Sequence, residues 1–232
     1  MVKVGDFMHF IDDYRDIQNK TKQGKQADLI FEEILTRCGI AGLTPQEQYD
    51  KLYDMLAANN DIHNEIIDAG LKQDVSVVGS VTEAICEIGI RAGVPENRFG
   101  RLPRQWKWLG DFAIFGSPFN TFISVKSYKA KERLIASGTG QLAAPIIGYG
   151  LFDDPKEWNP SRVDQYRHRN FIAIYLPRDL YDILASKTGV GQPVTDKKNF
   201  YGKPILRKIE DLPEDLKRVT SEPDNLLDLE LL

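Results

Sequence analysis

The stretch GDFAIFGSPFNTFISVK, residues 110–126, decides the fold of this chain of 232 residues. Two short apolar runs, residues 111–116 and 121–128, are separated by a Ser-Pro-Phe-Asn segment at 117–120. Apolar runs interrupted by proline and asparagine are typical of two strands joined by a turn. The stretch therefore predicts a β-hairpin at the centre of the fold.

Charged and polar side chains interrupt both apolar runs. Asp111 opens the first run, and the second carries Ser124 and Lys126. Side chains alternate across a strand, so Ser124 and Lys126 share one face and Val125 takes the other. A carboxylate and an ammonium inside apolar strands carry a desolvation penalty. Their presence therefore predicts a functional site on the hairpin.

These residues resemble the core of the PD-(D/E)xK nucleases, the superfamily of type II restriction endonucleases and Holliday-junction resolvases. In that superfamily an aspartate begins one strand and a (D/E)-x-K tripeptide lies on the next. Asp111 and Ser124-Val125-Lys126 stand at those positions, but Gly110 replaces the proline and Ser124 replaces the second acid. A Ser-Val-Lys variant is known among restriction enzymes, where a glutamate elsewhere provides the missing carboxylate. The resemblance covers roughly residues 75–176.

A helical run before the hairpin extends the resemblance. The segment GSVTE at 79–83 opens a run that ends at Gly93. Many members of the superfamily have a similar G-S-x-x-E on the helix that precedes the first active-site strand. The chain order of Glu83, Asp111 and Lys126 is also the order of the superfamily. The resemblance therefore implies that Glu83 is a metal ligand.

The resemblance also implies an architecture and a cofactor. The expected fold class is α/β (α+β), a restriction-endonuclease-like central mixed β-sheet flanked by helices, with a helical N-terminal region. The expected cofactor is Mg²⁺, bound by Asp111 and by a second carboxylate from Glu83 or Glu132, while Lys126 acts on the attacking water. Gln141 resembles a glutamine on the helix after the lysine strand of resolvase-like members. Simple surface polarity stays open for Glu132 and Gln141. The candidate catalytic residues are Asp111, Lys126, Glu83, Ser124, Glu132 and Gln141.

Charge is distributed unevenly along the chain, whose formal net charge is −4. Residues 1–74 hold 8 Lys and Arg against 14 Asp and Glu, residues 75–208 hold 20 against 12, and residues 209–232 hold 2 against 8. Cationic side chains that neutralise phosphates supply much of the affinity for DNA. The expected organisation is a helical N-terminal region (1–74) that covers the sheet, dimerises or clamps DNA, a nuclease core (75–208) and an acidic tail (209–232).

Basic residues near the expected site are candidate DNA contacts, because guanidinium groups bind phosphates and guanine edges in bidentate fashion. Residues 94–108, a predicted loop, carry four of them, and Trp106 and Trp108 in this loop are expected to pack against the hairpin. The full set is Arg98, Arg101, Arg104, Lys107, Lys129, Lys131, Arg133, Arg167, Arg169, Lys197 and Lys198.

Patterns in the rest of the chain give further elements. Residues 1–74 have apolar residues at helical spacing, a polar loop at 19–26, and a helix start with a capping box at Thr44 and Glu47. Two helices are expected between residues 45 and 69. Residues 170–177 predict a buried strand and residues 178–186 a helix. Residues 148–169 are expected to form a polar, turn-rich insert.

Several classes of protein are not indicated. His9, His63 and His168 lack the spacing of metal ligands, and the two cysteines are far apart, so neither a zinc hydrolase nor a disulfide framework is expected. The sequence has no apolar run of membrane-spanning length and no secretory signal at its start. We expect a cytoplasmic protein without a membrane partner.

The resemblance implies an Mg²⁺-dependent endodeoxyribonuclease that cuts double-stranded DNA at a specific sequence, a type II restriction endonuclease acting as a homodimer. A Holliday-junction resolvase or a DNA-repair nuclease is an alternative within the same superfamily. A DNA-binding or interaction domain without catalysis is an alternative of another class, because position 124 lacks the second acid.

Overall fold

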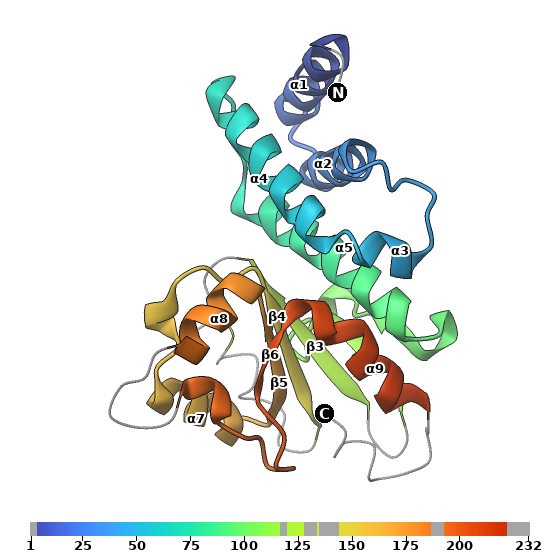
Figure 1. Cartoon of the computed structure of the whole chain (residues 1–232). Coiled ribbons are helices and arrows are strands. Elements are labelled where there is room, and N and C mark those ends of the chain that lie inside the picture. The colour runs from blue at the N-terminus through green and yellow to red at the C-terminus, as the bar shows by residue number, and fades with distance from the viewer. Residues whose placement is uncertain (1–3, 117–119, 128–133, 135–143, 187–192, 222–232) are drawn as a thin grey trace. The chain divides into compact units, whose positions relative to one another are not determined.

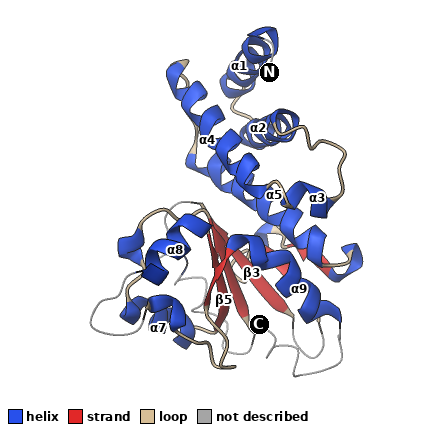
Figure 2. Ribbon diagram, in the orientation of Figure 1, coloured by secondary structure: helices blue, strands red, loops and turns tan. Residues whose placement is uncertain are grey.

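The computed structural model of the chain describes residues 4–116, 120–127, 134, 144–186 and 193–221. It divides into two compact units, Met1–Ile88 and Gly89–Leu232. The described part of the first unit is helical, and the second contains a β-sheet with helices around it (Figures 1 and 2). No helix among the described residues has the length and apolar character needed to span a membrane.

Helices account for the first unit, as the sequence predicts. They are α1 (Val4–Asn19), α2 (Gln23–Arg37), α3 (Pro45–Tyr49), α4 (Leu52–Asp68) and α5 (Val75–Gly93), the last of which crosses the unit boundary. The loop expected at 19–26 is much shorter, because α2 begins at Gln23. The two helices expected between residues 45 and 69 are found as α3 and α4.

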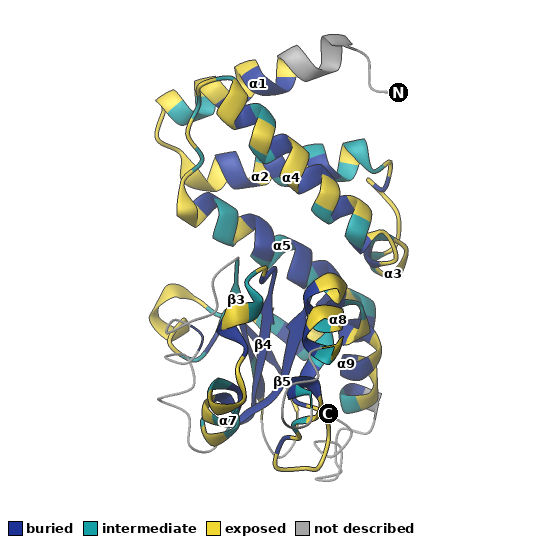
Figure 3. Ribbon diagram, turned by 60° about the vertical axis from the view of Figure 1, so that its left-hand side comes forward, coloured by how far each residue is buried: buried dark blue, intermediate teal, exposed yellow. Residues whose placement is uncertain are grey.

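The helices of the first unit bury apolar side chains at helical spacing. Ile30 and Ile34 on α2 and Ile62 and Ile66 on α4 are fully buried (Figure 3). Such spacing places the side chains on one helical face, where the hydrophobic effect favours their contact. The predicted capping box is confirmed at the start of α3, where the Thr44 hydroxyl accepts from the Glu47 amide and the Thr44 amide donates to the Glu47 carboxylate at 2.9 Å.

A six-stranded mixed sheet forms the centre of the second unit, and the expected fold class is confirmed. Its strands are β1 (Phe99–Arg101), β2 (Phe112–Ile114), β3 (Thr121–Lys126), β4 (Ile146–Gly150), β5 (Phe171–Leu176) and β6 (Leu206–Lys208). The order of the strands in the sheet is their order along the chain. The pairs β1–β2 and β2–β3 are antiparallel, and the following three pairs are parallel.

The predicted hairpin is confirmed as β2 and β3. Phe112 lies opposite Ile123, and Ile114 lies opposite Thr121. Beside the turn, the Gly116 amide donates to the Asn120 side-chain carbonyl at 3.3 Å. The apolar runs of the sequence therefore become neighbouring strands in the expected antiparallel pair.

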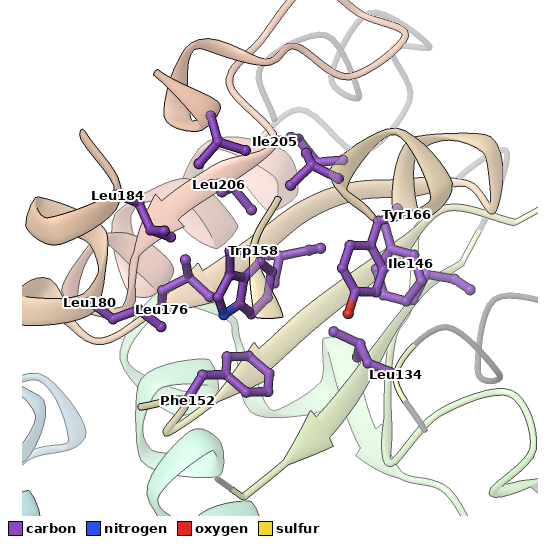
Figure 4. Packing of buried hydrophobic residues seen from close by; sticks show 14 residues of the cluster. Leu134, Ile146, Phe152, Trp158, Tyr166, Leu176, Leu180, Leu184, Ile205 and Leu206 are labelled. Carbon is purple, nitrogen blue, oxygen red and sulfur yellow. The ribbon is translucent and has the colours of Figure 1, made fainter. Parts of the chain in front are cut away.

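Helices cover both faces of the sheet (Figure 1). On one face, side chains of α7 (Pro160–His168) and α8 (Arg178–Ser186) join Ile174 and Leu176 of β5 in one buried cluster (Figure 4). Tyr175 lies between those two residues on β5 and so points to the opposite face. There its hydroxyl donates to Asp215 of α9 (Leu212–Ser221) at 2.8 Å. Burial of such apolar surface stabilises the sheet by roughly 25 cal/mol per Å².

Several strands and helices lie where the sequence predicted none. β1 lies inside the expected loop 94–108, and β4 and α7 overlap the expected insert 148–169. β6 was not predicted either, and α9 lies in the expected acidic tail. All five residues of β4 are buried between β3 and β5. At the end of α5, Gly93 lies against α9, where a Cβ would overlap the carbonyl group of Pro213.

Candidate active site

Gly110 allows Asp111 to lie close to β3. A Cβ at position 110 would lie 2.8 Å from the Ile123 carbonyl oxygen, and the backbone there has a φ of +157°. The next amide, that of Asp111, donates to the same oxygen at 2.7 Å. Proline fixes φ near −65°, so it does not fit this backbone. The departure from the superfamily's proline therefore has a local structural reason.

Asp111, directly before β2, lies close to Lys126 at the end of the neighbouring strand β3. Asp111 Oδ2 lies 3.8 Å from Lys126 Nζ, and the two side chains are only 11% and 18% exposed. The same carboxylate oxygen accepts the Val125 amide at 2.8 Å. The carboxylate is thus fixed by the backbone of β3 while it faces the ammonium group.

Ser124 fixes the position of the Lys126 ammonium group. Lys126 Nζ donates to Ser124 Oγ at 2.8 Å and to the Val125 carbonyl oxygen at 2.8 Å. Ser124 is buried, and it shares a strand face with Lys126 as the alternation predicts. A serine at this position therefore serves as a hydrogen-bond acceptor for the lysine.

Strand β4 presents glycines beside the two residues of β3. Gly148 is in register with Ser124, and Gly150 is in register with Lys126. A Cβ at Gly150 would lie 2.6 Å from the Lys126 carbonyl oxygen. Glycine inside a strand often marks a close backbone approach. The two glycines therefore let β4 approach β3 closely beside Ser124 and Lys126.

Lys107 also reaches the carboxylate of Asp111. Its Nζ lies 3.4 Å from Asp111 Oδ1, and the side chain is 45% exposed. With both lysines protonated, two ammonium groups surround one carboxylate. The local excess of positive charge attracts an anion such as a phosphate diester. The sequence predicted Lys107 as a DNA contact, and the structure places it directly at Asp111.

The other candidate catalytic residues lie in the first unit or outside the described residues. Glu83 is a half-buried residue of α5 in the first unit, whereas Asp111 and Lys126 belong to the second. Several candidate catalytic and DNA-binding residues lie outside the described residues: Glu132, Gln141, Lys129, Lys131 and Arg133.

The arginines before the hairpin have different surroundings. Arg104 is exposed on a 3₁₀ turn, Arg104–Trp106. Arg98 Nε donates to the Phe115 carbonyl oxygen at 3.0 Å. Arg101 lies over the ring of Phe112, at 5.1 Å from its centroid. Since Phe112 is in register with Ile123, which alternates with Ser124, Arg101 faces the side of the sheet opposite to Lys126.

The candidate contacts near α7 are partly engaged with other residues. Lys197 Nζ lies 2.6 Å from Asp164 Oδ2, and Arg167 lies over the ring of Phe200 at 4.9 Å from its centroid. Lys198 is exposed and Arg169 is half-buried.

The two tryptophans before Asp111 are exposed, so the expectation that they pack against the hairpin is wrong. Trp106 is 49% exposed and Trp108 is 55% exposed. Their ring centroids lie 6.2 Å apart with an interplanar angle of 36°. Their apolar character suggested burial, but the segment that carries them runs along the surface.

The donor set near Lys126 fits magnesium better than zinc. Mg²⁺ is commonly bound by one or two carboxylates together with waters and substrate phosphates, whereas zinc takes three or four protein ligands. Asp111 supplies one carboxylate near the Lys126 ammonium group. The Val125 carbonyl oxygen accepts a hydrogen bond from the same ammonium group. The described residues contain no cluster of three or more His, Cys, Asp or Glu suited to a metal ion.

No protein family model, no curated protein and no solved structure matches this chain. The resemblance to the nuclease superfamily therefore depends on the residues of the hairpin and on their geometry.

Proposed function

We propose that the chain is an Mg²⁺-dependent endonuclease that hydrolyses phosphodiester bonds of double-stranded DNA. One observation carries the proposal: the carboxylate of Asp111, directly before β2, and the ammonium group of Lys126, at the end of β3, lie 3.8 Å apart and are mostly buried, with a second lysine 3.4 Å from the carboxylate. Hydrolysis of a phosphodiester requires positive charge around the phosphate and a metal-bound water, and these groups suit both needs.

Each side chain of the cluster has a role in this mechanism. A bound Mg²⁺ supplies positive charge at the phosphate and lowers the pKa of the attacking water. Asp111 would hold the ion, and Lys107, whose Nζ lies 3.4 Å from Asp111 Oδ1, would bind the phosphate. Ser124 Oγ and the Val125 carbonyl oxygen hold Lys126 in place. Its fixed charge offsets the negative charge that grows in the transition state.

The finer assignment is a type II restriction endonuclease in the cytoplasm. The order of the two residues along the chain supports a restriction-endonuclease-like protein: Asp111 directly precedes β2, and Lys126 ends β3, the next strand of the mixed sheet. Cleavage of both strands at a two-fold symmetric site calls for a homodimer. A Holliday-junction resolvase or repair nuclease uses the same chemistry on another DNA structure.

A second candidate is a DNA-binding or interaction domain without catalysis. This candidate is favoured because Asp111 is the one carboxylate placed at the site by the described residues. Ser124 stands where the superfamily has a second acid, and the described residues form no larger acidic cluster.

Cleavage of supercoiled plasmid in Mg²⁺ tests the proposal. We expect the wild-type chain to give discrete linear fragments, and Asp111→Asn and Lys126→Ala to lower the rate at least a hundredfold while they still bind DNA in EDTA. Junction-specific cutting supports the resolvase, and binding without any cleavage supports the second candidate.

The Asp182–Lys208 pair provides a matched control, since it is an ion pair of the same unit at 2.9 Å. Asp182→Asn should cut plasmid at the wild-type rate. If Asp111→Asn or Lys126→Ala cuts as fast as this control, the assignment of the catalytic residues is wrong. Thermal unfolding of all three variants separates lost chemistry from lost structure.

A further inference from the structure

We propose that Trp106 and Trp108 bind an unstacked DNA base next to the candidate active site. The inference rests on the proposed function, because it describes how the DNA strand at Asp111 is held. The proposed ligand is the flat face of a nucleobase that has left the helical stack. The two tryptophans that would bind it were expected to pack against the hairpin.

The exposure of the two side chains is the first observation. Trp106 and Trp108 expose about half of their surface, and their rings contact each other at a centroid distance of 6.2 Å. Tryptophan is usually largely buried, and exposed apolar patches mark binding sites. A pair of neighbouring exposed indoles therefore indicates a ligand with an apolar face.

The backbone around the pair is already ordered. The Trp106 amide donates to the Pro103 carbonyl oxygen at 2.8 Å, and the Leu109 amide donates to the Trp106 carbonyl oxygen at 2.9 Å. These hydrogen bonds form two successive tight turns. Ordering of a segment before binding lowers the entropy lost when the ligand arrives.

The location of the pair connects it to the proposed chemistry. Trp108 precedes Asp111 by three residues, so their Cα atoms lie within about 11 Å of each other. Lys107, between the two tryptophans, contacts the Asp111 carboxylate. A strand whose phosphate lies at Asp111 therefore brings its neighbouring bases to the indole rings.

The positive charge near Trp106 and Trp108 favours a nucleic acid over uncharged ligands with apolar faces. Exposed Arg104 and Lys107 lie within two residues of Trp106, in a segment (97–110) that contains no Asp or Glu. Lys107 also contacts Asp111, which follows the segment. Proteins that bind single strands combine such cations with aromatic rings on which bases stack. The bases of an intact duplex are stacked on each other, so the bound base must be unpaired or turned out of the helix.

Binding in EDTA tests the inference without cleavage. The probes are a fluorescently labelled single strand, a fully paired duplex, and the same duplex with one unpaired base. We expect Trp106→Leu and Trp108→Leu each to weaken binding of the single strand and of the unpaired-base duplex about fivefold or more, as loss of one stacking contact does. Affinity for the fully paired duplex should change less than twofold.

Two further variants make the result specific. Trp106→Phe keeps a ring and should retain most of the affinity for the single strand. Ile183→Ala removes an exposed apolar side chain of α8 in the same unit and should have no effect. In addition, a single strand should quench the fluorescence of Trp106 and Trp108, while buried Trp158 keeps its emission.

Wild-type affinity of the leucine variants for the single strand overturns the inference, and so does an equal loss on all three probes. The experiments distinguish failure of this inference from failure of the proposed function. If Asp111→Asn still cuts plasmid while the tryptophan variants lose binding of single strands, the catalytic assignment fails and the stacking contact stands. If no probe binds the wild-type chain, both are wrong.

Discussion

In the described structure, the Asp111 carboxylate contacts a backbone hydrogen-bond donor and two ammonium groups. Val125 N, Lys107 Nζ and Lys126 Nζ all lie within 3.8 Å of its oxygens. A metal ion that binds this carboxylate therefore competes with the ammonium of Lys107, which is the more exposed of the two lysines. Metal affinity and phosphate affinity are linked at this residue through the position of one flexible side chain.

Asp211 gives a prediction about pH at the residue scale. Burial, and then the nearby carboxylates of Asp215 and Glu210, raise the pKa of Asp211 above its ordinary value of 3.8. The folded state therefore binds the proton more tightly than the unfolded state. The stability that this proton confers is present below pH 3.8 and is lost as pH rises through the folded pKa. We expect Asp211→Asn to raise the melting temperature at pH 7, and the gain to shrink as the pH falls towards 4.

Thermal melts of the wild type and Asp211→Asn between pH 7 and 4 provide the measurement. Asp153→Asn is the control, because Asp153 is an exposed acid of the same unit. An Asp211→Asn variant that melts below the wild type at pH 7 would show that the ionised carboxylate stabilises the fold.

At the scale of elements, the hairpin depends on Gly110. A Cβ there would meet backbone rather than a flexible side chain, 2.8 Å from the Ile123 carbonyl oxygen. We expect Gly110→Ala to lower the free energy of unfolding by about 1–3 kcal/mol, as overpacking does. Because the next residue is Asp111, its carboxylate should also shift, and plasmid cleavage should fall roughly tenfold or more.

Gly79 is the matched control for that change. It lies inside α5, and apart from its chain neighbours and the backbone of its own helix nothing lies within 4 Å of an added Cβ. Gly79→Ala should gain up to about 1 kcal/mol in helix propensity. Urea unfolding and the plasmid assay together check both variants. Equal stability of Gly110→Ala and the wild type would contradict the close approach between β2 and β3.

Helices α2 and α4 are joined by a bidentate ion pair. Arg37 donates to both oxygens of Glu65, at 2.8 and 2.7 Å, and to Glu33 at 2.7 Å, while its side chain is 14% exposed. Lysine lacks the planar fork that makes these bonds. We expect Arg37→Lys to lower the stability of the first unit by about 1–3 kcal/mol, measured by urea unfolding followed by circular dichroism.

The exposed pair Lys51–Asp54, at 3.4 Å, gives the comparison. Lys51→Met should change stability by less than about 0.5 kcal/mol, since exposed pairs contribute little. If both substitutions have the same small effect, the bidentate pair does not stabilise the helix contact.

The elements that the sequence predicts are those with local signals. The hairpin, the strand at β5, the helix α8 and the cap of α3 follow from apolar spacing, turn residues and capping residues. Strands β1 and β4 were missed for a physical reason. Each is short, and each is a strand because of hydrogen bonds to a distant segment, which local composition does not report.

The candidate site is predictable to a similar extent. Strand alternation placed Ser124 and Lys126 on one face, and the resemblance to the nuclease superfamily implied that Asp111 meets Lys126. Both contacts are present. The contact of Lys107 with Asp111 and the exposure of Trp106 were not predicted. Both depend on how the segment before β2 turns, which is set by hydrogen bonds to Pro103 and Trp106 carbonyl groups rather than by a residue pattern.

At the scale of the whole molecule, charge separates into segments. Residues 75–208 carry 20 cationic against 12 anionic side chains, although the chain as a whole is acidic. DNA affinity should therefore fall steeply with salt, and each phosphate contact adds about 0.9 to the slope of log K against log salt. We expect Arg104→Ala to reduce that slope by about one.

Lys25 is the control for the salt measurement, because it is an exposed cation of the acidic first segment. Lys25→Ala should leave the slope unchanged. Titrations at several salt concentrations in EDTA give both slopes. An unchanged slope for Arg104→Ala would place the DNA backbone away from the segment before the hairpin.

The agreement between strand order and chain order has a consequence for synthesis on the ribosome. Each strand from β2 onward emerges when the neighbour with which it pairs has already been made, so the sheet grows at one edge without waiting for later residues. The end of α5 is different, because Gly93 lies against Pro213 and meets it only when the chain as far as α9 has left the exit tunnel. A ribosome that stalls before α9 therefore leaves a nascent chain with a nearly complete sheet and an uncovered helix end, which chaperones and proteases recognise.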